Sequence, residues 1–181
     1  MMLHRLLLTG TLVGILGIAA QSPASTMTYT ATLSGANEVP PNGSTASGFA
    51  TFTLNGDMLT VDMSFTGLTG GPAAAAHIHC CAAPGTNAPV WIPFAGFPNM
   101  TSGTYTNTFD LATFSFSGGG TEAALIAGLN SGTAYTNIHD AEFPGGEVRG
   151  QISAVPEPGT LFLLSTGLAG GILTLRRRLS I

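Results

Sequence analysis

The residues best suited to chemistry lie together in the stretch Ala76-His77-Ile78-His79-Cys80-Cys81. It contains two of the chain's four histidines and both of its cysteines. Side chains alternate between the faces of a strand, so His-x-His predicts two imidazoles on one face and Ile78 pointing into a core. The segment Asn137-Ile138-His139 repeats the Ile–His pair and predicts a third imidazole that also points away from the core.

The last predicted strand, residues 147–152, extends this polar face. Its apolar side chains, Val148 and Ile152, face one way, and Glu147, Arg149 and Gln151 face the other. If all these strands share one core, the polar side chains lie beside the histidines. The pattern then predicts a Cu or Zn site, because imidazole and thiolate are ligands that both metals take. The candidate ligands are His77, His79, His139, Cys80 and Cys81, and the candidate residues around them are Glu147, Arg149 and Asp140.

Other interpretations of the same residues stay open at this point. The histidines also fit satisfied polar residues on a half-exposed strand. Cys80 and Cys81 have three alternatives in an oxidising compartment: a vicinal disulfide, pairing between chains, or the metal site. Arg149 fits either a site for an anionic ligand or an ion pair with a nearby carboxylate. Trp91 and its neighbouring aromatics fit either a glycan-stacking platform or the packing of a long loop.

Most of the chain between these motifs predicts strands. Apolar alternation marks residues 28–33, 50–54, 59–65, 74–79, 104–111, 134–139 and 147–152. Asn55-Gly56 predicts a tight hairpin turn, and residues 122–129 have helical spacing with a stop at Gly132. Residues 82–101 predict a long loop. Short strands with frequent turns predict an all-β fold, an antiparallel β-sandwich with at most one short helix.

The charge balance of the middle of the chain excludes some functions. Arg149 is the only Lys or Arg between Ser25 and Ala154, against eight Asp and Glu residues. A domain of this charge is a poor partner for nucleic acid or an anionic lipid surface. The sequence contains no Gly-x-Ser-x-Gly motif and no phosphate-binding loop. We therefore expect a protein that is not an enzyme.

The two ends of the chain predict export. Residues 1–24 combine a charged start, an apolar run and small residues, which is typical of a signal peptide. Residues 155–181 contain Pro156-Glu157-Pro158, an apolar run that we expect to form a membrane helix, and Arg176-Arg177-Arg178. This end resembles the PEP-CTERM sorting signal of Gram-negative bacteria. The resemblance implies export, a transient anchor in the inner membrane, processing by an exosortase, and delivery to the cell surface or extracellular matrix.

The domain between the ends, residues 25–154, resembles the CHRD domain, which is named after chordin. Four segments carry the resemblance in order: Leu33-Ser34-Gly35-Ala36-Asn37-Glu38-Val39-Pro40-Pro41, Ala76-His77-Ile78-His79, Asn137-Ile138-His139, and Gly145-Gly146-Glu147-Val148-Arg149-Gly150-Gln151-Ile152. It implies an immunoglobulin-like, all-β fold in an extracellular setting. The chain departs from the usual pattern at Cys80-Cys81 and at Asp140.

The His-x-His strand is also similar to the copper site of Cu,Zn superoxide dismutases, with His77 and His79 matching that motif. The domain has too few histidines for their dinuclear site. The sequence thus predicts an exported binding or structural module, with matrix polysaccharide or a surface protein as its partner and Cu or Zn as its metal. The alternative is a mononuclear Cu or Zn protein with redox activity at His77, His79 and His139.

Overall fold

The computed structural model describes residues 26–156, and the predicted signal peptide and membrane helix lie outside these residues. The described part contains nine strands, one α-helix and one 3-10 helix. The elements are β1 (Met27–Ser34), η1 (Gly35–Asn37), β2 (Ser47–Asn55), β3 (Met58–Thr66), β4 (Ala75–His79), β5 (Val90–Pro93), β6 (Gly103–Asp110), α1 (Glu122–Ser131), β7 (Tyr135–His139), β8 (Val148–Gln151) and β9 (Ser153–Ala154). Among them, no helix is long and apolar enough to cross a membrane.

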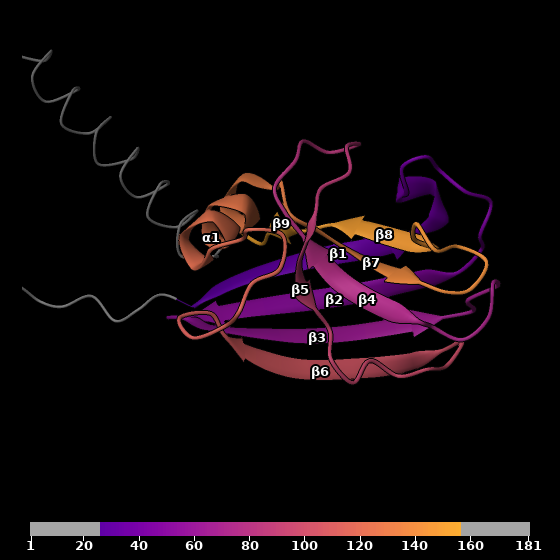
Figure 1. Cartoon of the computed structure of the whole chain (residues 1–181), viewed down its shortest axis with the longest axis horizontal. Coiled ribbons are helices and arrows are strands. Elements are labelled where there is room, and N and C mark those ends of the chain that lie inside the picture. Colours follow the sequence, from indigo (N-terminus) through magenta and orange to yellow (C-terminus); the bar gives the residue numbers. More distant parts are fainter. Residues whose placement is uncertain (1–25, 157–181) are drawn as a thin grey trace, which may run out of the picture.

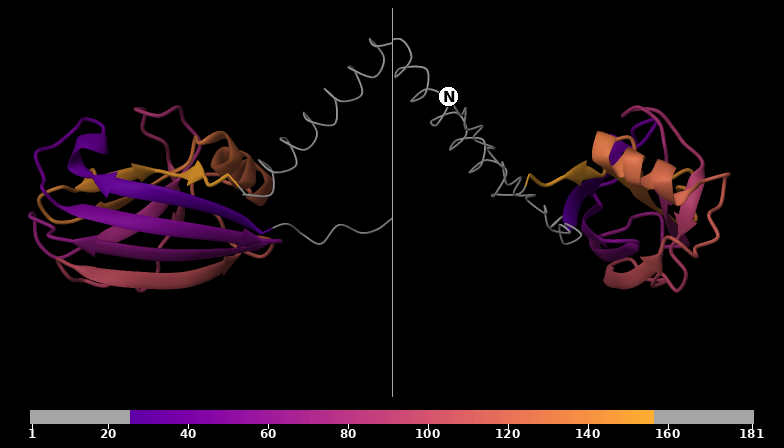
Figure 2. Two further views of the ribbon diagram at one scale, coloured as in Figure 1. Left: turned by 180° about the vertical axis from the view of Figure 1, so that it is seen from behind. Right: turned by 90° about the vertical axis from the view of Figure 1, so that its left-hand side faces the viewer.

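All nine strands belong to one sheet, in which every recorded pair is antiparallel. The order is β5-β4-β7-β8-β1-β2-β3-β6, and β9 pairs with β1. The sheet curls, so that β4 and β5 pass in front of the long strands β1 to β3 (Figures 1 and 2). The all-β, antiparallel prediction with one short helix is confirmed. The hydrogen bonds join both halves into a single curled sheet instead of two separate layers, and the immunoglobulin-like assignment stays a prediction.

The core fills the inside of this curl. The strand alternation expected from the sequence is confirmed, because Ile78, Ile138, Val148 and Ile152 are all fully buried. Long strands from the other half of the sheet contribute Tyr29, Leu33, Phe52, Leu59 and Val61, which are also fully buried. The polar residues between these positions therefore point to the outer face of the sheet.

The β2–β3 hairpin forms as predicted, but its turn lies one residue later. Asn55 pairs with Met58, so Gly56 and Asp57 are the two central residues of the turn. Only Gly56 has a positive φ, at 58°. A two-residue hairpin turn needs a glycine at its first central position when only that position has positive φ.

Helix α1 begins at Glu122 and ends before Gly132, as the sequence predicted, and Thr121 caps its N-terminus. The Thr121 hydroxyl accepts a hydrogen bond from the Ala124 N–H at the N-terminus. Gly132 ends the helix in the left-handed region, with a φ of 68°. A residue with a Cβ is disfavoured there, which explains why the helix stops at this glycine.

The prediction of a long loop over residues 82–101 is partly wrong, because strand β5 lies within this range. Trp91 and Ile92 on this strand, and Phe94 just after it, are buried in the core. A stacking platform for glycans needs exposed rings, so the packing interpretation of these aromatics is the one that the structure supports.

Candidate metal centre

Strands β4 and β7 bring the three predicted histidines together. His77 and His79 lie on β4, and His139 is the last residue of β7. The two strands pair directly, with His77 opposite Asn137 and Ala75 opposite His139. One ring nitrogen from each histidine lies within 4.8 Å of the others. Ligand atoms on one Zn ion are about 3.4 Å apart in a tetrahedral site, so the three rings would have to move closer together by about 1 Å to bind a single ion.

Backbone carbonyls hold two of the imidazoles in a defined tautomer. His79 Nδ1 lies 2.8 Å from the carbonyl oxygen of Ala88, and His139 Nδ1 lies 3.0 Å from that of Pro144. A carbonyl oxygen only accepts hydrogen bonds, so each Nδ1 must carry the proton. In the neutral form of each ring, Nε2 then has a free lone pair.

Both lone pairs point at the side chain of Asn137, which lies on β7. Asn137 Oδ1 lies 3.0 Å from His79 Nε2 and 2.9 Å from His139 Nε2. His77 adds Nδ1, which is buried and has no hydrogen-bond partner. Three acceptor atoms, the two Nε2 atoms and Asn137 Oδ1, therefore lie close together, and the buried His77 Nδ1 is left without a partner.

Burial keeps the three rings neutral. Burial, together with the smaller effects of the neighbouring His139 and His79, lowers the pKa of His77 to about 4. Burial also lowers the pKa of His79 and of His139. Neutral imidazole is the form that binds a metal, so the cluster needs no deprotonation near pH 7.

Arg149 packs beside the cluster without touching it. Its guanidinium lies 3.3 Å above the ring of Tyr135, and that ring stacks on His79 with 4.5 Å between centroids. The guanidinium donates hydrogen bonds to the Asn87 side chain and to the Thr86 carbonyl oxygen. Arg149 thus secures the loop that carries the Ala88 carbonyl, and these contacts are not the ion pair that the sequence allowed.

Glu147 and Asp140 act on the loop between β7 and β8. The Glu147 carboxylate accepts hydrogen bonds from the backbone and hydroxyl of Thr69 and from the Ser44 hydroxyl. Asp140 accepts from the N–H groups of Glu142 and Phe143. The sequence analysis placed Glu147 among the residues around the imidazoles, where it would orient one of them. The structure gives that role to backbone carbonyls, and both acids hold the loop that presents Pro144.

The pKa values of the two acids shift in opposite directions. Burial raises the pKa of Asp140, and its hydrogen bond to Glu147 raises it further. Burial alone would raise the pKa of Glu147, but the hydrogen bonds from Asp140, Ser44 and Thr69 lower it. Asp140 therefore binds a proton more readily than an ordinary aspartate, and Glu147 binds one less readily than an ordinary glutamate.

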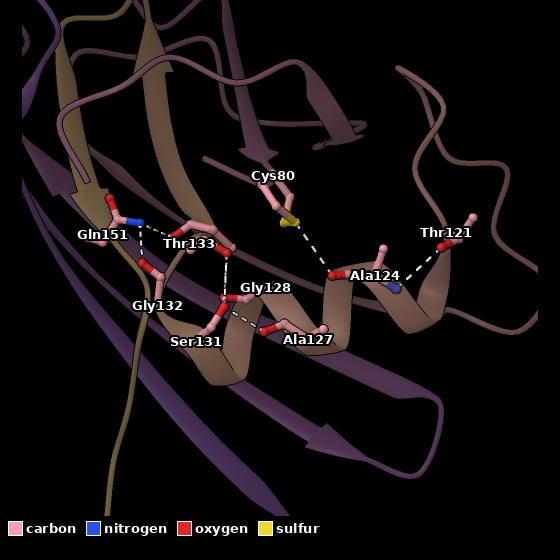
Figure 3. Close-up of a disulfide and its surroundings, with 11 residues drawn as sticks. Cys80, Thr121, Ala124, Ala127, Gly128, Ser131, Gly132, Thr133 and Gln151 are labelled. Atoms are coloured by element: carbon pink, nitrogen blue, oxygen red, sulfur yellow. Dashed lines mark hydrogen bonds between the residues drawn. A yellow bond between two sulfur atoms is a disulfide. The ribbon is translucent and has the colours of Figure 1, made fainter. Parts of the chain in front are cut away.

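The cysteines lie apart from the histidine cluster. Cys80 and Cys81 form a vicinal disulfide, one of the three alternatives that the sequence allowed. Cys81 Sγ lies 3.5 Å from the Ala124 carbonyl oxygen, against α1 (Figure 3). The close ligand atoms of the cluster come from His77, His79 and His139 alone among the described residues. The structure places the sulfurs under the helix, where Gly128 leaves room for them.

Asn137 and Glu38 are the site residues that the sequence analysis missed. Asn137 lies two positions before His139, so strand alternation alone could have placed it on the histidine face. Glu38 reaches the same region from the loop after η1 and is only 5 % exposed. Burial raises its pKa to about 7, against the lowering effects of Arg149 and of hydrogen bonds from Val39 and Asn137.

Comparison with known proteins identifies two families along the chain. The CHRD domain matches residues 29–152, and the PEP-CTERM protein-sorting motif matches residues 154–178. No curated protein and no solved structure matches the chain. The first match covers all strands from β1 to β8, including the three histidines, Asn137 and Glu38. The chain therefore belongs to the CHRD domain family and ends in a PEP-CTERM sorting motif.

Proposed function

We propose that this protein is an exported surface module whose CHRD domain binds one divalent transition metal through His77, His79 and His139. The PEP-CTERM motif indicates export and sorting to the surface of a Gram-negative cell, and it implies processing by an exosortase. The metal is Zn or Cu, since imidazole nitrogen is a ligand that both accept. The module works by binding, without catalysis, and a matrix polysaccharide or a surface protein is the partner we predict for it.

The convergence of lone pairs is the observation that carries this proposal. His79 and His139 keep their protons on Nδ1 and direct Nε2 at one point, where Asn137 Oδ1 also lies. Electron pairs that face each other repel, and burial prevents water from separating them at low cost. A metal cation at this point would satisfy all of them. A purely structural cluster would instead have the Asn137 amide turned, so that Nδ2 donates a hydrogen bond to each Nε2.

The structural role follows from the loops that the histidines touch. His79 is bonded to the loop before β5, and His139 is bonded to the loop between β7 and β8. A metal held by both rings would tie these two surface loops to β4. The bound metal then shapes the surface that the module presents to its partner.

Metal content tests the proposal. We would purify the full chain in detergent from a Gram-negative host, without chelators, and measure metals by inductively coupled plasma mass spectrometry. We expect about one Zn or Cu per chain in the wild type and almost none in His77→Ala/His79→Ala. The matched control is Thr51→Ala/Thr53→Ala on β2, which should keep the metal. A wild type without stoichiometric metal would exclude the proposal.

A further inference from the structure

We infer that Asn137 is the fourth ligand of the metal, through Oδ1, and that Glu38 is the positioning residue that holds the amide in this orientation. The inference rests on the proposed metal site and adds its remaining protein ligand. It also gives a role to the Glu38-Val39-Pro40-Pro41 segment, which the three histidines leave unexplained.

The position of Asn137 fits a coordination shell. It lies on β7 directly opposite His77, with its Oδ1 2.9 to 3.0 Å from two imidazole nitrogens. Ligand atoms about 2.0 to 2.1 Å from one metal ion are separated by about 2.9 to 3.4 Å, for octahedral and tetrahedral angles respectively. Asn137 is 2 % exposed, so its amide cannot turn outward to bond with water.

Glu38 determines which end of the amide faces the histidines. Asn137 Nδ2 and Glu38 Oε1 both lie against Gly146, and Glu38 Oε1 is buried with no hydrogen-bond partner in the structure. The ionised form of Glu38 only accepts hydrogen bonds and an amide nitrogen only donates them, so an ionised Glu38 favours the observed orientation, with Nδ2 on its side. The oxygen must then point at His79 and His139.

Gly146 makes this contact possible. Its φ is 126°, and a Cβ at this position would collide with both Glu38 Oε1 and Asn137 Nδ2. The loop between β7 and β8 therefore needs glycine here to let the carboxylate reach the amide. The same loop carries the Pro144 carbonyl that holds His139.

Charge gives Glu38 a second effect. Three neutral imidazoles and a neutral amide leave the full charge of a divalent ion uncompensated in a buried place. A carboxylate beside the amide nitrogen offsets part of this charge and polarises the amide oxygen toward the metal. Carboxylates that orient a ligand in this way change metal affinity by about 10- to 100-fold when removed.

The oxygen ligand also bears on which metal binds. An amide oxygen is a hard donor, whereas Cu(I) prefers soft thiolate and thioether ligands. A site of three nitrogens and one oxygen therefore favours Zn(II) or Cu(II) over Cu(I). This disfavours cycling between two copper oxidation states and favours a structural metal.

Four variants of the full chain in detergent test the inference. Asn137→Leu removes the oxygen, Asn137→Asp keeps an oxygen ligand and adds charge, and Glu38→Gln keeps the shape of the positioning residue. The matched control is Asn107→Leu on β6, in the other half of the sheet. Zn affinity is measured by competition with a chromophoric chelator, and the Co(II)-loaded proteins give visible spectra that report the donor set.

We expect Zn affinity to fall about 10- to 100-fold in Asn137→Leu and in Glu38→Gln. Asn137→Asp should bind at least as tightly as the wild type. The Co(II) spectrum should change in both Asn137 variants and stay the same in Asn107→Leu. Should Asn137→Leu fail to fold, Asn137→Asp decides, because weaker binding or an unchanged spectrum there contradicts ligation by Oδ1.

The outcomes separate the two proposals. Wild-type protein that binds no metal overturns both of them. Wild-type protein that binds metal, together with Asn137 variants of unchanged affinity and spectrum, overturns the fourth ligand and leaves the histidine site standing. Unchanged affinity in Glu38→Gln alone overturns the positioning role of Glu38.

Discussion

The outer face of the curled sheet has two regions that differ in how far their polar side chains are buried. The histidine face, on β4, β7 and β8, carries His77, His79, Asn137 and Arg149. The threonine face, on β1, β2, β3 and β6, carries one row of Thr30, Thr51, Asp62 and Thr106, which lie opposite one another in register. Both faces alternate over the same core. Asn137 and Arg149 are 2 % exposed, whereas Asp62 and Thr106 are exposed to solvent.

The loops account for this difference. On the histidine face, the segments before β5 and between β7 and β8 supply carbonyl oxygens that bond to imidazoles. On the threonine face, pairs such as Asp62 and Thr106 bond across neighbouring strands in contact with water. Burying a polar group costs free energy unless it is hydrogen bonded. A buried group whose partners are fixed is held in one defined orientation. The comparison teaches that alternation creates two polar faces here, and that covering loops turn one of them into a site.

The largest expected difference between the faces is the response to metal. Zn at about 1,000 times its Kd should raise the free energy of unfolding of the wild type by about 4 kcal/mol, because it binds only the folded form. His77→Ala/His79→Ala should lose this gain, and Thr51→Ala/Thr53→Ala should keep it. Calorimetry with Zn and then with EDTA measures both. If Zn stabilised His77→Ala/His79→Ala as much as the wild type, the metal would bind at another site.

The next effect concerns the buried carboxylates. Glu147→Ala should lower the free energy of unfolding by about 2 to 4 kcal/mol, because Glu147 is fully buried and bonds to Ser44 and Thr69. Asp62→Ala on the threonine face should cost less than about 0.5 kcal/mol. Urea unfolding of metal-free protein compares the two. Similar losses of unfolding free energy in the two variants would show that the covering loops do not make polar contacts on the histidine face more stabilising.

Acid should weaken the metal-free protein through the histidines. The pKa of His77 is about 4 in the folded protein, below its ordinary value of 6.5. Between these values the unfolded chain binds a proton that the folded chain does not, so stability falls as the pH falls from about 6.5 to 4. The decline ends below about pH 4, where both states are protonated. Urea unfolding with a chelator present measures this profile.

The matched variant for the acid profile is His77→Gln. It should show a smaller loss of stability over the same pH range, although His79 and His139 still contribute in the same direction. Thr106→Ser on the threonine face should follow the wild-type profile. Identical profiles for wild type and His77→Gln would mean that His77 does not have a lowered pKa.

Strand alternation explains why much of this arrangement could be predicted from the sequence. A period of two places Ile78 and Ile138 inside and their neighbouring histidines outside, whatever the rest of the chain does. The hairpin and the helix stop followed from Gly56 and Gly132 because few other residues adopt positive φ. The strand β5 was missed because Val90-Trp91-Ile92-Pro93 is short and lies in a stretch rich in proline and glycine.

The chemistry of the site needed the tertiary structure. Which nitrogen of His79 carries the proton depends on the carbonyl of Ala88, nine residues away in a loop of irregular shape. The Asn137 amide lies with Nδ2 against Gly146 and beside Glu38 Oε1, which is about a hundred residues away in the sequence. Local patterns contain no information on such contacts. Strand alternation alone placed Glu147 beside the imidazoles. In the structure its carboxylate is hydrogen bonded to Thr69 and Ser44 instead.

The smallest expected effect comes from the threonine face itself. Thr60 and Thr108 bond to each other across β3 and β6 with 2.9 Å between their hydroxyl oxygens, in contact with water. Thr60→Val keeps the shape and the β-branched side chain, and it should change the free energy of unfolding by less than about 0.5 kcal/mol, since water replaces the lost partner. Urea unfolding of Thr60→Val is compared with that of Asn137→Leu. Asn137 is buried, so water cannot replace the hydrogen bonds that this variant loses. A cost above about 1 kcal/mol for Thr60→Val would mean that the hydroxyl pairs stabilise the sheet as strongly as the buried contacts do, and that exposure alone does not separate the two faces.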